Sequence, residues 1–337
     1  MNRILLILAI AVLLLPAPPS GKDEPLEPSS VDISAVAVPL DADNPDRTSL
    51  GPLTFLGAWT LSSAHPLFGG ISSLLVQDDG SLLGLSDSSV LIGFPAPATR
   101  RTDRAAVIPG HSFIAPLPVM PQEADWPIWK WDSEALVHDP ESDKYWVSFE
   151  LIARICRYSS ALARVESCAR PPDIYAWPKT EMGEAMVRLP DGRFLIFGEG
   201  APGRSGGLDV LLFSDDPAEQ STPAPMHLSY LPPQGFRPTD AVMLSPDTLI
   251  LVNRRATLWQ GFTATLALVR LPRRMTPDTL LKGEAIALLA PPILADNFEA
   301  LALSREGGRR ILWVASDDNH EFFQRSLLLK FALPAGW

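Results

Sequence analysis

The sequence has few basic residues, few cysteines and no long amphipathic helix. Of its 337 residues, 28 are Lys or Arg and 39 are Asp or Glu, so the net charge is −11. Such a chain is a poor partner for nucleic acid, because phosphate contacts need clustered Lys and Arg. What remains is a series of short apolar runs, separated by many of the 34 prolines. This pattern favours strands joined by loops.

The two cysteines, Cys156 and Cys168, are close together in the sequence. A metal site built on them is disfavoured, since there is no third cysteine and the nearest histidine is His138. In an oxidising compartment, a disulfide that closes this short hairpin would contribute about 3 kcal/mol through loop entropy. We therefore predict a structural disulfide between them.

The first twenty residues, MNRILLILAIAVLLLPAPPS, have a basic start, an apolar core of about a dozen residues and a Pro-rich end. This pattern predicts a signal peptide over residues 1–20, and an uncleaved anchor is the alternative. We expect a periplasmic or secreted protein with no membrane span after cleavage. An acidic, Pro-rich segment with one strand would follow at residues 21–50, and a single domain at residues 51–337.

One sequence pattern occurs five times. Each copy has two apolar runs around a turn such as Asp79-Gly80 or Ser245-Pro246-Asp247, which is typical of a β-hairpin. The copies are FGGISSLLVQDDGSLLGLSD (68–87), WDSEALVHDPESDKYWVSFE (131–150), MGEAMVRLPDGRFLIFGEG (182–200), PTDAVMLSPDTLILVNRR (238–255) and NFEALALSREGGRRILWVASDDN (297–319).

A hairpin cannot bury both of its faces alone, so repeated hairpins of this spacing predict units stacked around a common core. Strands without helices favour the blades of a β-propeller over a solenoid. We expect six blades, with five as the alternative. The runs at 31–40 and 51–62 are predicted to be strands that close the ring with the C-terminal run at 326–333.

Acidic residues recur at one position of this repeat. Alignment places Ser72, Glu134, Glu184, Asp240 and Glu299 together, at steps of 50 to 62 residues. In a propeller, the first strand of each blade lines the central channel, so these side chains should converge on one channel mouth. Such carboxylates repel one another unless a cation intervenes, and they suit Ca²⁺. The alternative is that they cap strands and bind loop amides. The predicted metal ligands are Glu134, Glu184, Asp240, Glu299, Asn297 and Asp317.

The second strands of the hairpins end in a further polar set at the same mouth: Asp87, Glu150, Glu199, Arg254 and Asp317. Arg254 differs in sign, and an arginine beside an acidic cation site can bind an anionic substrate. It could instead only neutralise Glu199 or Asp240.

The five motifs together resemble the phytase-like domain family of bacterial exported proteins, over about residues 51–333. The resemblance implies a β-propeller with an esterase-like or phytase-like hydrolase activity. Ser72 departs from the carboxylate pattern. The matching positions are Asp132, Glu134, Glu150, Glu184, Glu199, Asp240, Arg254, Asn297, Glu299, Asp317, Asp318 and Asn319.

Two functions follow from these patterns. The first is a hydrolase of a phosphomonoester or other ester that uses a divalent cation, with Glu134, Glu184 and Arg254 as catalytic residues. Its substrate would contact Glu150, Glu199, Arg254 and Asn319. The second is a non-catalytic propeller that binds a glycan, peptide or envelope partner through its mouth and a Trp-rich connection containing Trp126 and Trp129. In either case we expect a monomer.

Overall fold

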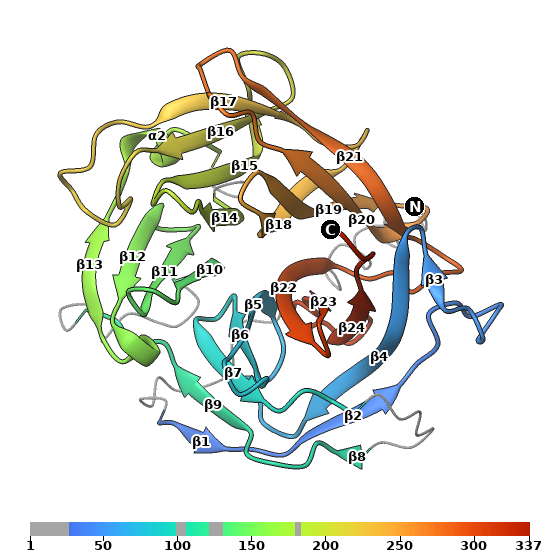
Figure 1. Cartoon of the computed structure of the whole chain (residues 1–337). Coiled ribbons are helices and arrows are strands. Elements are labelled where there is room, and N and C mark those ends of the chain that lie inside the picture. Colours follow the sequence, from blue (N-terminus) through green and yellow to red (C-terminus); the bar gives the residue numbers. More distant parts are fainter. Residues whose placement is uncertain (1–26, 99–105, 121–130, 179–182) are drawn as a thin grey trace, which may run out of the picture.

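Antiparallel strands arranged around a central axis make up the chain (Figure 1). The structure is a computed structural model that describes residues 27–98, 106–120, 131–178 and 183–337. The predicted signal peptide, Trp126 and Trp129 lie outside these residues. No helix of the described part is long and apolar enough to cross a membrane.

The first two groups of strands come from the first two sequence repeats. From the axis outward, the first group is β5 (Ile71–Val76), β6 (Leu82–Ser86), β7 (Val90–Phe94), β9 (Phe113–Pro116) and β1 (Ser29–Ser30). The second is β10 (Ser133–Asp139), β11 (Lys144–Phe149), β12 (Arg154–Tyr158) and β13 (Val165–Ala169). The short helix η3 (Ser160–Leu162) joins β12 to β13.

The third and fourth groups share one sheet, because their outermost strands β17 and β21 pair in parallel. The short helix α2 (Pro172–Tyr175) precedes the third group, which is β14 (Ala185–Arg188), β15 (Phe194–Pro202), β16 (Leu208–Phe213) and β17 (Met226–Leu231). The fourth is β18 (Arg237–Ser245), β19 (Thr248–Thr257), β20 (Gly261–Arg270) and β21 (Leu280–Leu289).

The fifth group joins the two ends of the chain. It runs β22 (Phe298–Glu306), β23 (Arg309–Ser316), β24 (Leu327–Ala332), β4 (Leu53–Ser63), β2 (Ile33–Ala37) and β8 (Ala106–Val107), with β3 (Ser49–Leu50) paired to β4. The predicted closure by N-terminal and C-terminal strands is therefore present. The predicted count of six blades is not confirmed, because β4 and β2 extend the sheet that begins with β22 and form no separate inner strand within the described residues.

Apolar side chains fill the spaces between neighbouring groups. Ile155 on β12 packs toward the third group, whereas its neighbour Cys156 packs toward the first. The same alternation recurs around the ring, and a further cluster containing Trp59, Ile71 and Trp313 packs the fifth group against the first. Both faces of the sheets are therefore buried, which explains why the strands read as apolar runs rather than as alternating sequences. The ring of packed groups is that of a β-propeller.

The predicted disulfide is present between Cys156 and Cys168. The two residues are direct partners in the β12–β13 ladder. The bond closes the outer hairpin of the second group and leaves no free cysteine.

Candidate functional site: an acidic channel mouth

The inner strands all begin at one end of the channel. β5, β10, β14, β18 and β22 neighbour one another around the axis, and the second strand of each hairpin returns to the same end. Backbone hydrogen bonds join Asp87 to Gly70, Glu150 to Asp132 and Asp317 to Asn297, so the end of each second strand lies beside the start of its first. We call this end of the channel the mouth.

A β-bulge at the start of the inner strands controls which side chains reach the mouth. The pairing of β22 with β23 skips Glu299, and that of β10 with β11 shifts around Glu134. Glu184 precedes β14 at the corresponding place. A bulge re-aims a side chain relative to the regular ladder and is common beside active sites.

The other two bulge positions carry hydroxyls. Ser72 and Thr239 are the skipped residues of β5 and β18. Their hydroxyls donate to the backbone carbonyl of the first residue of a neighbouring inner strand: Ser72 to Ser133 at 2.7 Å, and Thr239 to Phe298 at 3.2 Å. Both hydroxyls hold neighbouring blades together, and neither adds charge to the mouth.

The register places Thr239, not Asp240, at the position of Glu134 and Glu299. Asp240 forms a regular pair with Val252, one residue past the bulge. Its carboxylate accepts hydrogen bonds from the backbone amides of Ala241 at 2.7 Å and Leu301 at 2.6 Å. Asp240 therefore binds backbone amides, which is the alternative to metal binding that the sequence left open. The hydrogen bond from the Leu301 amide links β18 to β22.

Three carboxylates of the second group converge at the mouth. Asp132, Glu134 and Glu150 each offer an oxygen, and these oxygens lie within 4.8 Å of one another. Asp132 has a φ of 45°. A non-glycine residue in the left-handed region costs on the order of 1–3 kcal/mol, and such strain is concentrated at functional sites. Of the predicted metal ligands, this cluster contains Glu134, and it adds Asp132 and Glu150.

The pKa values of these groups are shifted upward. Burial, followed by repulsion from Asp87, raises the pKa of Asp132 to about 6. Burial, then the charges of Glu184 and Asp132, raises the pKa of Glu134 well above its usual range. A carboxylate cluster of this kind holds a proton or a cation at neutral pH.

Arg254 lies on the other side of the mouth. Its guanidinium donates to Glu199 at 3.0 Å, to Asn297 at 2.9 Å and to Glu299. Burial alone would lower the pKa of Arg254, but the negative charges of Glu299, Glu184 and Glu199 raise it above its usual value. Arg254 therefore neutralises two carboxylates of the mouth. They are those of Glu199 and Glu299, and not that of Asp240.

Glu184 interacts electrostatically with both sides of the mouth: with Glu134 on one side and with Glu199 and Arg254 on the other. Burial and the nearby Glu199 raise its pKa well above the usual range, and Arg254 only partly opposes this. Glu299 and Asp317 form a second carboxyl pair. Burial raises the pKa of both, and the neighbouring Glu299 raises that of Asp317 further.

Two predicted site residues are used in other ways. The Oδ1 atom of Asn297 accepts a hydrogen bond from Arg254, so this oxygen already has a partner. Asn319 is exposed and donates from its side chain to Gln324 at 3.0 Å. The residue after it, His320, lies 3.9 Å from a carboxylate oxygen of Asp87 at the rim.

The sequence placed Asp132 and Asp87 among the polar residues of the repeats. It did not predict that the carboxylate of Asp132 would lie beside those of Glu134 and Glu150. The backbone pairing of Asp132 with Glu150, which the hairpin register implies, is the signal for that grouping.

Comparison with known proteins assigns the family. The family model described as Phytase-like, "Esterase-like activity of phytase", matches residues 66–320. The chain belongs to this phytase-like family. A search of curated proteins finds no match.

Several solved structures are similar in fold. They include glutaminyl cyclase from Myxococcus xanthus, with 8% identity and a TM-score of 0.43, over 84% of this chain and 97% of that one. An α-L-arabinofuranosidase from Clostridium thermocellum has 12% identity and a TM-score of 0.45, over 78% and 93%. The allergen Mala s 1 from Malassezia sympodialis has 12% identity and a TM-score of 0.39, over 84% and 77%.

Proposed function

We propose that this protein is an exported hydrolase of a phosphomonoester or other ester, with a divalent cation in the acidic mouth. The observation that carries the proposal is the convergence of Asp132, Glu134 and Glu150 within 4.8 Å. Hard oxygen donors in a flexible set are the ligands of Ca²⁺. The family description supports an ester as the substrate.

The donor set fits a cation better than it fits an anion. The pKa values of Asp132 and Glu134 are raised by burial and by neighbouring carboxylates, so bound positive charge would relieve a repulsion already present. Arg254 is committed to Glu199, Glu299 and Asn297. An anionic ester would therefore reach this mouth only together with the cation. When bound, a divalent cation polarises the carbonyl or phosphoryl oxygen of the ester.

The residues of the chain supply the proton chemistry. Glu184 has a raised pKa and lies in the field of both Glu199 and Arg254, so it can hold a proton at neutral pH and deliver it to the leaving oxygen. Arg254 keeps the Glu199 and Glu299 side chains in place through its three contacts, and it acts as a positioning residue.

Export is part of the same proposal. The apolar leader at residues 1–20 and the Cys156–Cys168 disulfide both support an oxidising compartment.

The test is hydrolysis by the chain from residue 21 to residue 337, with Ca²⁺ or with a chelator. A chromogenic phosphomonoester, a short-chain ester and a lactone would be compared for the wild type and Glu134→Gln. We expect turnover of one substrate that needs the cation and falls at least about a hundredfold in the variant, since a lost electrostatic contact at the reacting centre costs about that much. Glu141→Gln is the matched control, because Glu141 is exposed in the turn at the far end of the same hairpin. A folded protein that turns over none of the three would instead indicate a binding propeller.

A further inference from the structure

Two connections at the mouth end carry large apolar side chains in water. Leu258 and Trp259, between β19 and β20, are 100% and 96% exposed. Phe322 and Phe323, between β23 and β24, are 92% and 53% exposed. Exposed apolar residues that occur singly need no explanation, but paired ones on neighbouring loops do. We call these four residues the apolar tips.

The β19–β20 hairpin places Leu258 and Trp259, the first of the apolar tips, at its end. The β19–β20 ladder continues past Arg254, and Thr257 pairs with Gly261 around a three-residue loop. Gly261 has a φ of 63°, the conformation such a loop requires at this point. The amide of Gln260 donates to Thr257, which orders the turn while Leu258 and Trp259 remain outside it.

The loop that carries Phe322 and Phe323, the second of the apolar tips, is anchored by hydrogen bonds to Asp318. Asp318 accepts from the Gly70 amide at 2.9 Å and from the Ser326 hydroxyl at 2.5 Å, so both ends of the loop are anchored. The two Phe rings pack edge to face at 5.3 Å. Their loop follows Asp317 directly, as the first tip follows Arg254.

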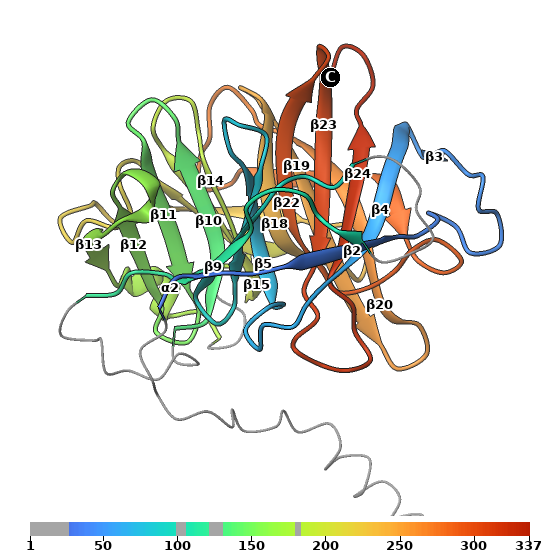
Figure 2. The ribbon, with the colours of Figure 1, turned by 90° about the horizontal axis from the view of Figure 1, so that it is seen from below.

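Both tips therefore project from the side of the molecule that holds the carboxylates. Figure 2 shows the β19–β20 and β23–β24 connections on the same side of the ring. The second group adds Leu151, which follows Glu150 and is 45% exposed. The opposite end is poorer in such residues, with Met226 at the start of β17 as an example.

We propose that the apolar tips dock the mouth on a lipid surface. Convex tips with one or two large side chains each need no preformed pocket in a fluid apolar phase, and Trp favours the boundary between apolar and polar regions. The acidic mouth selects a zwitterionic surface over an anionic one. The described part of the chain begins on this side, because Ser29 pairs with Ile114 on the mouth side of Ser30 and Phe113. The apolar run at residues 4–15 precedes it in the sequence.

The substrate class follows if the proposed function holds. An ester presented at a lipid surface would meet the mouth with its polar head toward Asp132, Glu134 and Glu150 and its apolar part beside the tips. This part of the inference rests on the proposed function, whereas lipid docking itself does not.

The experiment measures binding of the 21–337 chain to phosphatidylcholine vesicles by co-sedimentation, and repeats it with added phosphatidylglycerol. The variants are Leu258→Ser/Trp259→Ser and Phe322→Ser/Phe323→Ser, with Met226→Ser as the exposed control at the far end. We expect each double variant to lose about tenfold or more in vesicle affinity, from the burial of two large apolar side chains. The control should bind like the wild type, and phosphatidylglycerol should weaken binding when Ca²⁺ is absent.

Two results would overturn the inference. One is equal vesicle binding by the wild type and both double variants, or binding by none of them. The other is a wild-type dimer that the tip variants convert to a monomer without any vesicle binding, which would make the tips a contact between copies. Hydrolysis of a water-soluble ester, measured on the same samples, distinguishes these results from failure of the proposed function: it should be unchanged in all tip variants.

Discussion

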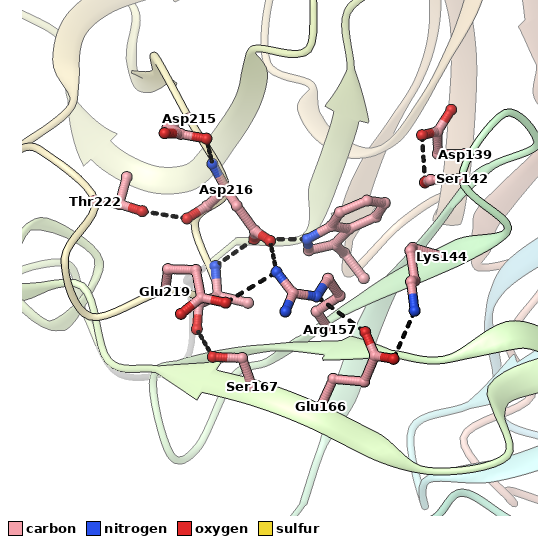
Figure 3. A network of polar contacts seen from close by, with 12 residues as sticks. Asp139, Ser142, Lys144, Arg157, Glu166, Ser167, Asp215, Asp216, Glu219 and Thr222 are labelled. Atoms are coloured by element: carbon pink, nitrogen blue, oxygen red, sulfur yellow. Dashed lines mark hydrogen bonds and ion pairs between the residues drawn. The ribbon is translucent and has the colours of Figure 1, made fainter.

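Acidic residues cluster both at the mouth and on the outer face of the second group, but their pKa values are shifted in opposite directions at the two places. On the outer face, Glu166 contacts Lys144 at 2.5 Å and Arg157 at 3.2 Å, and Arg157 also contacts Asp216 and Glu219 (Figure 3). The Lys144 hydrogen bond, opposed by burial, holds the pKa of Glu166 below its usual value. At the mouth, burial and neighbouring carboxylates raise the pKa of Glu134 instead.

This difference separates a structural cluster from a candidate site. The outer network alternates charges, and its polar contacts extend to the indole N–H of Trp146, which donates to Asp216 at 2.7 Å. It links β11, β12 and β13 to the connection after β16 and has no need of a ligand. At the mouth, Arg254 contacts Glu199 and Glu299 on one side, whereas on the other side burial and neighbouring carboxylates raise the pKa values of Asp132 and Glu134. Perturbed pKa values of this kind are concentrated at binding and catalytic sites.

The largest expected effect comes from removing Arg254, which contacts Glu199 and Glu299 at the mouth. Arg254→Met leaves Glu199 and Glu299 buried without their partner, which should lower the free energy of unfolding by about 3–5 kcal/mol. Thermal and urea unfolding would measure the loss. It should be smaller at about pH 5 than at about pH 7.5, because protonation removes the uncompensated charges. Arg255→Met is the control, since Arg255 contacts the exposed Gln260. Equal losses in the two variants would contradict the account.

A second expected effect is on the pH dependence of stability. The pKa of Asp132 is about 6 in the fold, above its unfolded value of about 3.9. The folded state therefore binds more protons between these values, and the free energy of unfolding should fall as pH rises from about 4 to about 7, by on the order of 2 kcal/mol for Asp132. Glu166 and Asp139 have lowered pKa values, so their contribution is lost only below about pH 4. Thermal unfolding from about pH 5 to pH 7.5 isolates the mouth, and the Asp132→Asn variant should flatten the profile. A wild-type profile that rises with pH would rule out this assignment.

The smallest expected effect is on the outer face. Glu166→Gln weakens the contacts to Lys144 and Arg157, but Asp216 and Glu219 still hold Arg157. Because these side chains are partly exposed, the cost should be about 1 kcal/mol. Urea unfolding checks this, and ester hydrolysis should be unchanged. A loss of activity with little loss of stability would mean that the outer network, too, serves the site.

The sequence predicted the architecture better than it predicted the site. Apolar runs and turns such as Asp79-Gly80 located the hairpins, since both depend on local residues. The position of Asp240 depended on a one-residue bulge at Thr239, which no local pattern specifies and which moves every later side chain to the other face. The predicted count of six blades, with five as the alternative, is not confirmed for a related reason. The sequence shows that β2, β4 and β24 are strands, but not that they belong to the sheet of β22.

The central claim is that the Asp132–Glu134–Glu150 cluster at the mouth holds a divalent cation. The most direct measurement is the melting temperature of the 21–337 chain at about pH 7.5, with and without Ca²⁺, for the wild type and Glu134→Gln. The account predicts that Ca²⁺ stabilises the wild type, by about 2.7 kcal/mol at a hundredfold excess over the dissociation constant, and has much less effect on the variant. Equal stabilisation of the two proteins, or none of either, would contradict it.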